Sequence, residues 1–340
     1  MTAARSFTDP FKMVDVTPTI NRIPNSWGLI SASGMFEEEF ISNTTVEFEQ
    51  VDFGLSLVKD QYRGARNSVN ADRNRKIHSF VATHHPLDDQ LTAKDLSGVR
   101  AYGGTDAAET EQKALLRKLE DMTRKHDATL EAARVHTLVT GTQYAPNGTV
   151  TADFYTAFGM TRKVVDFALA GTGATLVMEK GEEVIAHIQD NLQTGLTAGG
   201  ITMYCSPGFF SKVIKQAGVL DAYRAYSSNQ EPLRQRLGGP DALMRQFYHS
   251  GVTYIEYRAA FNGVALIPAN EAYAVPTNVP GFGVTYFSPA QKMNLVNTIG
   301  ERRYAFTYPD TKNEFIELNT EQNFINLVKY PQAIVKCFTV

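Results

Sequence analysis

The stretch that decides the fold is residues 106–140, DAAETEQKALLRKLEDMTRKHDATLEAARVHTLVT. Residues whose side chains can pack in a protein core recur in it at spacings of three and four, which places them on one face of an α-helix. These positions are Leu115, Leu119, Met122, His126, Leu130 and Ala133. Asp106 and Glu109 match a capping box at the start. The pattern predicts one helix about 50 Å long, whereas an average helix has about 11–12 residues.

The other faces of this helix are rich in charge. Glu109 with Lys113 and Glu120 with Arg124 stand at i,i+4, which predicts solvent-exposed faces supported by ion pairs. His126 differs because it lies on the apolar stripe. We interpret it as a packed or hydrogen-bonded core histidine rather than a metal ligand.

Before the helix, the sequence predicts a long two-stranded projection. Four apolar residues alternate at period two, the pattern of a strand: Val51, Phe53, Leu55 and Leu57. Residues 77–83 indicate the return strand. Residues 59–76 between them hold six basic and two acidic side chains, a local charge of +4. An isolated hairpin is only marginally stable in water, and a merely solvated loop is the alternative interpretation of this stretch.

After the helix, strands and helices interleave over residues 179–299, which indicates an α+β or α/β unit. Pro146-Asn147-Gly148 predicts a hairpin turn. Ser206 before Pro207 predicts a helix start, with serine as N-cap and proline in the first turn. The other expected elements are a helix at 179–192, strands at 201–204, 252–257 and 264–267, a short helix or loop at 241–247, and terminal strands at 315–318 and 333–338.

Composition excludes several classes of protein. The 340 residues contain 33 Lys and Arg against 36 Asp and Glu, a net charge of −3, so no global positive charge exists for wrapping nucleic acid. Two cysteines, Cys205 and Cys337, cannot make a disulfide framework, and a reducing compartment is the simpler expectation. We expect no signal peptide and no membrane span, because neither apolar pattern is present.

No catalytic, cofactor or metal site is predicted. Gly171-Thr172-Gly173 lacks the third glycine of a dinucleotide loop, and Tyr204 stands where a nucleophile elbow needs glycine. The one cluster of metal-ligand type is His84-His85-Pro86-Leu87-Asp88-Asp89. Adjacent histidines on a strand point to opposite faces, so we interpret it as a solvated strand end.

The order of these elements resembles a Hong-Kong-97-type viral shell subunit, and the sequence itself resembles the phage lambda-type major capsid protein E family. The likeness covers nearly the whole chain. The stretches that carry it are residues 11–14 through 23–25, 85–89, 98–103, 124–131, 205–207, 286–290 and 296–300.

The resemblance implies an α+β capsid fold in four parts. They are an N-terminal arm (1–45), an extended β-hairpin loop (46–98), a peripheral domain with a long spine helix (99–178 and 300–340) and an axial domain (179–299). It implies a major capsid protein of a tailed phage, assembling through hexamers and pentamers into an icosahedral or prolate shell around double-stranded DNA. It also implies scaffold, portal and decoration proteins as partners, assembly in the host cytoplasm and a final place in the virion.

Charge distribution predicts one contact between subunits. Residues 37–52 carry six acidic and no basic side chains, a charge of −6. We expect the positive hairpin stretch of one subunit to meet acidic groups of another; solubilising charge on both segments is the alternative. The residues singled out are Glu37, Glu38, Glu39, Arg63, Arg66, Arg73, Arg75 and Lys76.

Two other functions remain open on the sequence. A non-viral nanocompartment shell of the same fold would have the same architecture. A cysteine hydrolase would use Cys205 with a distant histidine such as His187 or His249, and it would need a thiolate of low pKa in a cleft.

Overall fold

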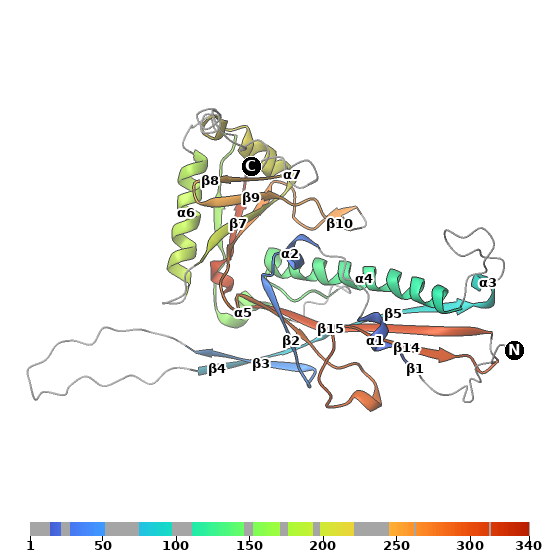
Figure 1. Ribbon diagram of the computed structural model, residues 1–340. Helices are drawn as coiled ribbons and strands as arrows, with labels where there is room; N and C mark the ends of the chain where they lie inside the picture. The colour runs from blue at the N-terminus through green and yellow to red at the C-terminus, as the bar shows by residue number, and fades with distance from the viewer. Residues whose placement is uncertain are drawn as a thin grey trace, which may run out of the picture. The chain divides into compact units, whose positions relative to one another are not determined.

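The structure is a computed structural model, whose elements are labelled in Figure 1. It describes residues 14–21, 28–51, 75–96, 111–145, 152–170, 176–192, 198–220, 245–261, 263–312 and 314–339. By their contacts, these residues form two compact units. The first unit draws on Met1–Val46, Val81–Arg134 and Thr285–Asn326, and the second on Glu47–Phe80, Val135–Val284 and Leu327–Val340.

The first unit is built on a sheet of order β1-β14-β15-β13-β2, in which β5 also pairs with β15. Its strands are β1 (Val14–Asp15), β2 (Phe36–Phe40), β5 (Thr83–Thr92), β13 (Gly283–Phe287), β14 (Tyr304–Pro309) and β15 (Phe315–Val328). The long strand β15 organises the sheet, because it pairs antiparallel with both β14 and β5. The predicted strand at 315–318 is therefore confirmed and extends ten residues further, to Val328.

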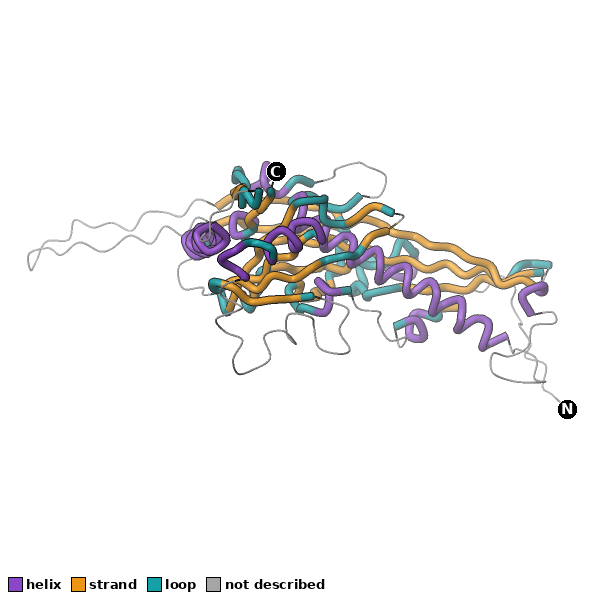
Figure 2. The backbone as a smooth tube through the Cα atoms, turned by 90° about the horizontal axis from the view of Figure 1, so that it is seen from above, coloured by secondary structure: helices purple, strands orange, loops and turns teal. Residues whose placement is uncertain are grey.

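Helix α4 (Glu111–Thr140) lies along β5 and β15, which are labelled in Figure 1, and Figure 2 shows the same arrangement from above. Its apolar stripe makes the core here, since Leu119 and Met122 pack with Leu91 of β5 and Leu318 of β15. The prediction of one long helix is thus confirmed from Glu111 onward, while the capping box at 106–109 lies outside the described residues. The described part of this unit also contains three short helices and one 3-10 turn: α1 (Thr17–Ile20), α2 (Leu29–Ala32), α3 (Ala93–Leu96) and η1 (Met293–Leu295).

The two predictions about histidines have different outcomes. His126 is buried, and its Nε2 lies 2.9 Å from Oγ1 of Thr320, so the core interpretation is confirmed. The interpretation of 84–89 as a solvated strand end is wrong, because these residues lie inside the ten-residue strand β5. Neighbouring side chains do face opposite ways: His84 is exposed, whereas His85 is buried and stacks on Phe324 at 4.6 Å.

The second unit contains a sheet of order β6-β16-β12-β7-β9-β8. Its strands are β6 (Lys163–Asp166), β7 (Gly200–Cys205), β8 (Gln246–His249), β9 (Val252–Glu256), β12 (Glu271–Thr277) and β16 (Val335–Phe338). The central strands β7 and β12 are buried along most of their length. Helix α6 (Leu176–Asn191) packs on β6 and β12, and α7 (Pro207–Ile214) packs on β7 and β9.

The described part of the second unit also contains two hairpins and two short helical elements. The strands β3 (Thr45–Val51) and β4 (Arg75–Val81) form a sheet of their own, and β10 (Ala260–Phe261) pairs with β11 (Val264–Ala265). Near the base of the first hairpin, the Phe80 ring meets those of Phe154 and Phe158 on α5 (Phe154–Phe158) edge to face. A short 3-10 turn, η2 (Pro331–Ala333), precedes β16. The middle of the predicted β3–β4 projection, residues 52–74, lies outside the described residues.

Most local predictions for the second unit are confirmed. Ser206 is the N-cap of α7 with Pro207 in its first turn, although the serine hydroxyl makes no capping hydrogen bond. The predicted short helix or loop at 241–247 is wrong in its described part, because Gln246 begins strand β8. The turn predicted at 146–148 lies outside the described residues.

Candidate assembly surface

Strand β2 carries the acidic triplet that the sequence singled out. Alternation along the strand leaves Glu37 and Glu39 exposed and turns Glu38 toward buried groups of the first unit. Tyr286 on β13 lies beside the exposed pair. Its burial and the negative charges of Glu39 and Glu37 raise the pKa of Tyr286 to about 12. β2 therefore presents two carboxylates from an ordered sheet edge.

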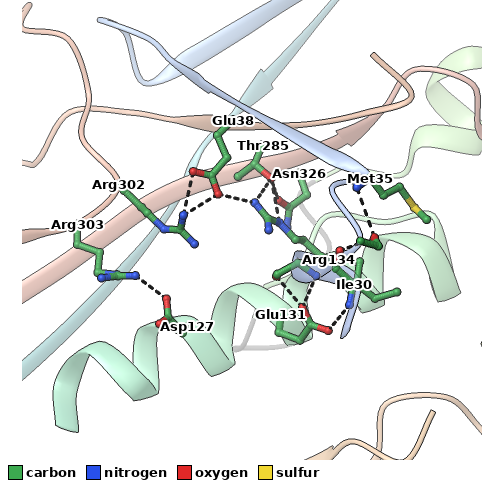
Figure 3. Close-up of polar contacts among 12 residues, drawn as sticks. Ile30, Met35, Glu38, Asp127, Glu131, Arg134, Thr285, Arg302, Arg303 and Asn326 are labelled. Carbon is green, nitrogen blue, oxygen red and sulfur yellow. Dashed lines mark hydrogen bonds and ion pairs between the residues drawn. The ribbon is translucent and has the colours of Figure 1, made fainter. Parts of the chain in front are cut away.

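Two arginines hold Glu38 in place (Figure 3). Its Oε1 accepts a hydrogen bond from Nη2 of Arg134 at 3.0 Å and lies 2.9 Å from Nη1 of Arg302. Arg134 also donates to Oγ1 of Thr285, which in turn donates to Oδ1 of Asn326 at 2.8 Å. The middle residue of β2 is thus tied to α4, to β13 and to β15.

Burial makes this network sensitive to the loss of one member. The Arg134 side chain is 1% exposed, and desolvation lowers its pKa while the Glu38 carboxylate raises it. An arginine stays charged in proteins, so removal of Glu38 would leave a buried cation with weaker compensation. Breaking a buried pair from one side typically costs about 3–5 kcal/mol.

A second buried pair lies two helical turns away along α4. Nη2 of Arg303 lies 2.6 Å from Oδ1 of Asp127, and both side chains are almost fully buried. Burial lowers the pKa of Arg303, and the Asp127 carboxylate opposes that shift. The pair joins α4 to the residue that immediately precedes β14.

Glu131 caps the short helix α2. Its carboxylate accepts hydrogen bonds from the backbone N–H groups of Ile30 at 2.8 Å and Ser31 at 2.9 Å, and from the Ser31 hydroxyl at 2.6 Å. These N–H groups belong to the first turn of α2, where no intrahelical acceptor exists. The contact needs glycine at position 28, because a Cβ there would lie 2.1 Å from Cδ of Glu131.

Sequence reasoning missed these buried charges, because it assigned every charged residue of the helix to solvent. Asp127, Glu131 and Arg134 are buried instead. A signal for them exists: they are the only charged residues from 126 to 140, and their spacings of four and three place them on one helix face. Charge that is sparse and confined to one face of a largely apolar helix indicates internal pairing.

The structure places part of the predicted basic set. Arg75 lies on β4 and forms an exposed ion pair with Glu49 of β3 at 3.4 Å, within the same chain. Lys76 is exposed on the same strand. Arg63, Arg66 and Arg73 lie outside the described residues.

The described residues hold no arrangement suited to the hydrolase alternative. Cys205 is fully buried, and burial raises the pKa of its thiol well above the usual value, the opposite of an activated nucleophile. Nε2 of His187 lies 3.1 Å from the Gln332 carbonyl oxygen. No group of three or more His, Cys, Asp or Glu within the described ranges could hold a metal ion. None of the described helices is long and apolar enough to cross a membrane.

Comparison with known proteins gives concordant results. The family model described as phage major capsid protein E matches residues 12–339. The major capsid protein of Pseudomonas phage KPP10 is 42% identical over 344 residues, which cover 97% of this chain and 97% of that protein. The major capsid protein of Salmonella phage Felix O1 (isolate Felix O1-VT1) is 28% identical over 357 residues, covering 96% and 95%.

Solved structures show the same fold at low identity. The asymmetric unit of the bacteriophage PhiM1 mature capsid matches with a TM-score of 0.54 and 11% identity, over 93% of this chain and 90% of that chain. The capsid structure of cyanophage P-SCSP1u matches with a TM-score of 0.52 and 11% identity, over 90% and 86%. These likenesses confirm the expected α+β capsid fold. The sequence matches extend over almost the whole polypeptide, and the chain belongs to the phage major capsid protein E family.

Proposed function

We propose that this chain is the subunit of a tailed-phage head, and that its copies assemble through hexamers and pentamers into a closed icosahedral or prolate shell. The family match over residues 12–339 carries the proposal. Many weak contacts suffice for such an assembly, because closure of the shell turns later contacts into intramolecular ones. No catalytic step is part of this function.

The four-part division of the subunit belongs to the same proposal. The arm (1–45) and the extended loop (46–98) reach neighbouring subunits, the peripheral domain (99–178 and 300–340) contains the spine helix, and the axial domain (179–299) meets the symmetry axis. The slender β3–β4 hairpin supports this reading, since a two-stranded sheet gains little stability by itself.

Charge pairing between copies completes the assembly contact. The exposed Glu37 and Glu39 on β2 meet the basic set Arg63, Arg66, Arg73, Arg75 and Lys76 of another copy. Glu38 has a structural role instead, because its contacts with Arg134 and Arg302 fix strand β2, on which Glu37 and Glu39 are exposed. Exposed pairs contribute only about 0.2–1 kcal/mol each, so they set register and association rate more than total strength.

The shell encloses double-stranded DNA without binding it specifically. A net charge of −3 supports this, because a strongly basic lining would hold phosphates by counterion release. Scaffold, portal and decoration proteins complete the proposed set of partners. Assembly takes place in the host cytoplasm, and the product is the virion.

Electron microscopy of the purified full chain tests the proposal. We expect hollow closed particles, with hexameric and pentameric units resolved after averaging. Subunits that stay monomeric by sedimentation velocity from about 0.05 to 1 M salt, a range that spans weak and strong screening, would contradict it. A nanocompartment of the same fold would also form particles; it would package a protein cargo rather than DNA in the producing cell.

A further inference from the structure

The loop between β13 and β14 carries three strongly exposed apolar side chains in the first unit. Met293, Val296 and Ile299 are 93%, 61% and 71% exposed. They stand three residues apart, starting in the 3-10 turn η1. Exposed apolar side chains concentrated in one short loop, here residues 293–299, differ from singly scattered ones and indicate an interaction site.

The loop holds these side chains outward in a fixed conformation. At one end the Ser288 N–H donates to the Asn323 carbonyl at 3.0 Å, and at the other the Gly300 N–H donates to the Ile41 carbonyl at 2.9 Å. Gly300 is required there, because a Cβ would lie 2.4 Å from the Phe287 carbonyl oxygen. Leu295 packs inward against a cluster of Ala290, Tyr304 and Phe306. A surface ordered before binding loses less conformational entropy when a partner arrives.

A groove of about 850 Å³ lies against this loop. Residues 42–45, Val81, Ala82, His84 and Asn323 form its other walls. The wall opposite the loop begins at Ser42, two residues after β2 ends at Phe40, which is also exposed. Protein interfaces commonly have an apolar centre and a polar rim, and here the apolar loop is continuous with the acidic strand of the proposed charge contact.

The composition of the loop indicates which partner fits. Lys292 is the only charged residue from 288 to 300, and its ammonium lies over the rings of Phe306 and Tyr308 at 5.2 and 5.3 Å. The loop therefore offers no cluster of free positive charge for a nucleic-acid backbone. An apolar surface continuous with a self-association surface fits another copy of the same chain.

We propose that Met293, Val296 and Ile299 form an apolar contact with a second copy of this chain. The inference rests on the proposed shell function and adds to it the apolar centre of one subunit interface. In this contact, burial of the three apolar side chains holds the copies together. The charged residues of the proposed pairing, Glu37 and Glu39 with the basic set, surround it and set the register.

Methionine oxidation tests this contact in the unchanged full chain. Dilute hydrogen peroxide is applied to unassembled subunits and to particles assembled from the purified chain alone, and oxidation of each methionine is followed by mass spectrometry. We expect Met293 to oxidise about ten-fold more slowly in particles, a change equal to about 1.4 kcal/mol. Buried Met203 is the internal control that should remain unreactive in both. Equal Met293 rates, or protection only when another protein is present, would overturn the inference.

A triple substitution, Met293→Ser, Val296→Ser and Ile299→Ser, tests it a second way. Because the side chains are exposed, we expect unfolding of the isolated subunit to be nearly unchanged and particle yield to fall about ten-fold or more. Met178→Ser on α6, another exposed methionine, is the matched control and should keep its yield. Full yield from the triple variant overturns this contact alone, whereas failure of the unchanged chain to form particles overturns the shell function with it.

Discussion

Oε1 of Glu38 lies 3.0 Å from Nη2 of Arg134, so the centre of an edge strand is bound to a guanidinium that is almost completely buried. The two neighbours of Glu38 in sequence face solvent. One residue of the acidic triplet therefore stabilises the fold, while the other two lie on the exposed face of the strand. These two roles are separated because successive side chains along a strand point to opposite faces of the sheet.

Glu38→Gln should destabilise the first unit by about 2–3 kcal/mol, because the amide keeps a hydrogen-bond acceptor but loses the charge that compensates Arg134. Glu38→Ala should cost more, about 3–5 kcal/mol. Urea unfolding of unassembled subunits measures both. Glu39→Gln on the same strand is the control and should change stability by less than about 0.5 kcal/mol. Equal stability of the Glu38 and Glu39 variants would show that the buried network has no energetic role.

Glu131→Gln should loosen α2 from α4. The carboxylate accepts three hydrogen bonds, and a neutral amide oxygen replaces them with fewer and weaker ones, for an expected loss of about 1–3 kcal/mol. Hydrogen exchange at the Ile30 and Ser31 amides is the direct measurement, and both should exchange faster. Glu120→Gln, an exposed position on the same helix, should leave these amides protected. Unchanged exchange in Glu131→Gln would mean that other contacts hold α2.

Periodicity was sufficient to predict the regular elements that have one buried face. The helix from 111 to 140 and the apolar strand β7 have patterns that only one secondary structure satisfies well. Strand β5 has no such pattern, because His84, Pro86 and Asp88 are polar or strand-breaking residues. Its place in the sheet comes from pairing with β15, which is distant in sequence. Long-range pairing of this kind has no local signal.

The candidate assembly surface was likewise predictable from the sequence only in part. The acidic triplet on β2 was visible as a charge cluster, but the partners of Glu38 lie 96 and 264 residues away in sequence. The exposure of Met293 could not be predicted from the sequence either. An apolar residue in a loop is expected in the core, and only the fold shows whether its side chain faces solvent. Sequence thus indicated which residues bear charge, and only the fold showed which of them are already neutralised.

Acid should destabilise the first unit through two buried histidines. Burial lowers the pKa of His85 and of His126 to about 4, with His84 and Arg303 adding smaller shifts in the same direction. In the unfolded chain both titrate near 6.5, so between these values the unfolded state binds more protons. The stabilisation is complete above about pH 6.5 and is lost as the pH falls toward 4, on the order of 3 kcal/mol for each histidine.

Unfolding of His126→Gln by urea, compared with the unchanged chain at pH 7 and at about pH 4.5, isolates this contribution from that of the carboxylates. Glutamine can keep a hydrogen bond to Thr320 but does not titrate. The variant should lose less stability on acidification than the unchanged chain. An identical loss in both proteins would contradict the assignment to His126.

Reversal of charge on the hairpin, Arg73→Glu with Arg75→Glu, should slow assembly and weaken its dependence on salt. The only described partner of Arg75 is Glu49 at 3.4 Å in an exposed ion pair, so folding of the subunit should change by less than about 1 kcal/mol. The effect on assembly is larger because every copy in a shell repeats it. Light scattering during assembly at about 0.05 and 0.5 M salt, where screening differs strongly, measures the rate.

Arg124→Glu, exposed on α4 and paired with Asp121 at a similar 3.4 Å, is the matched control. Adding Glu37→Lys and Glu39→Lys to the reversed hairpin should restore part of the rate, because the signs are again opposite. A reversed hairpin that assembles at the original rate and salt response would leave both charged segments with no role beyond solubility.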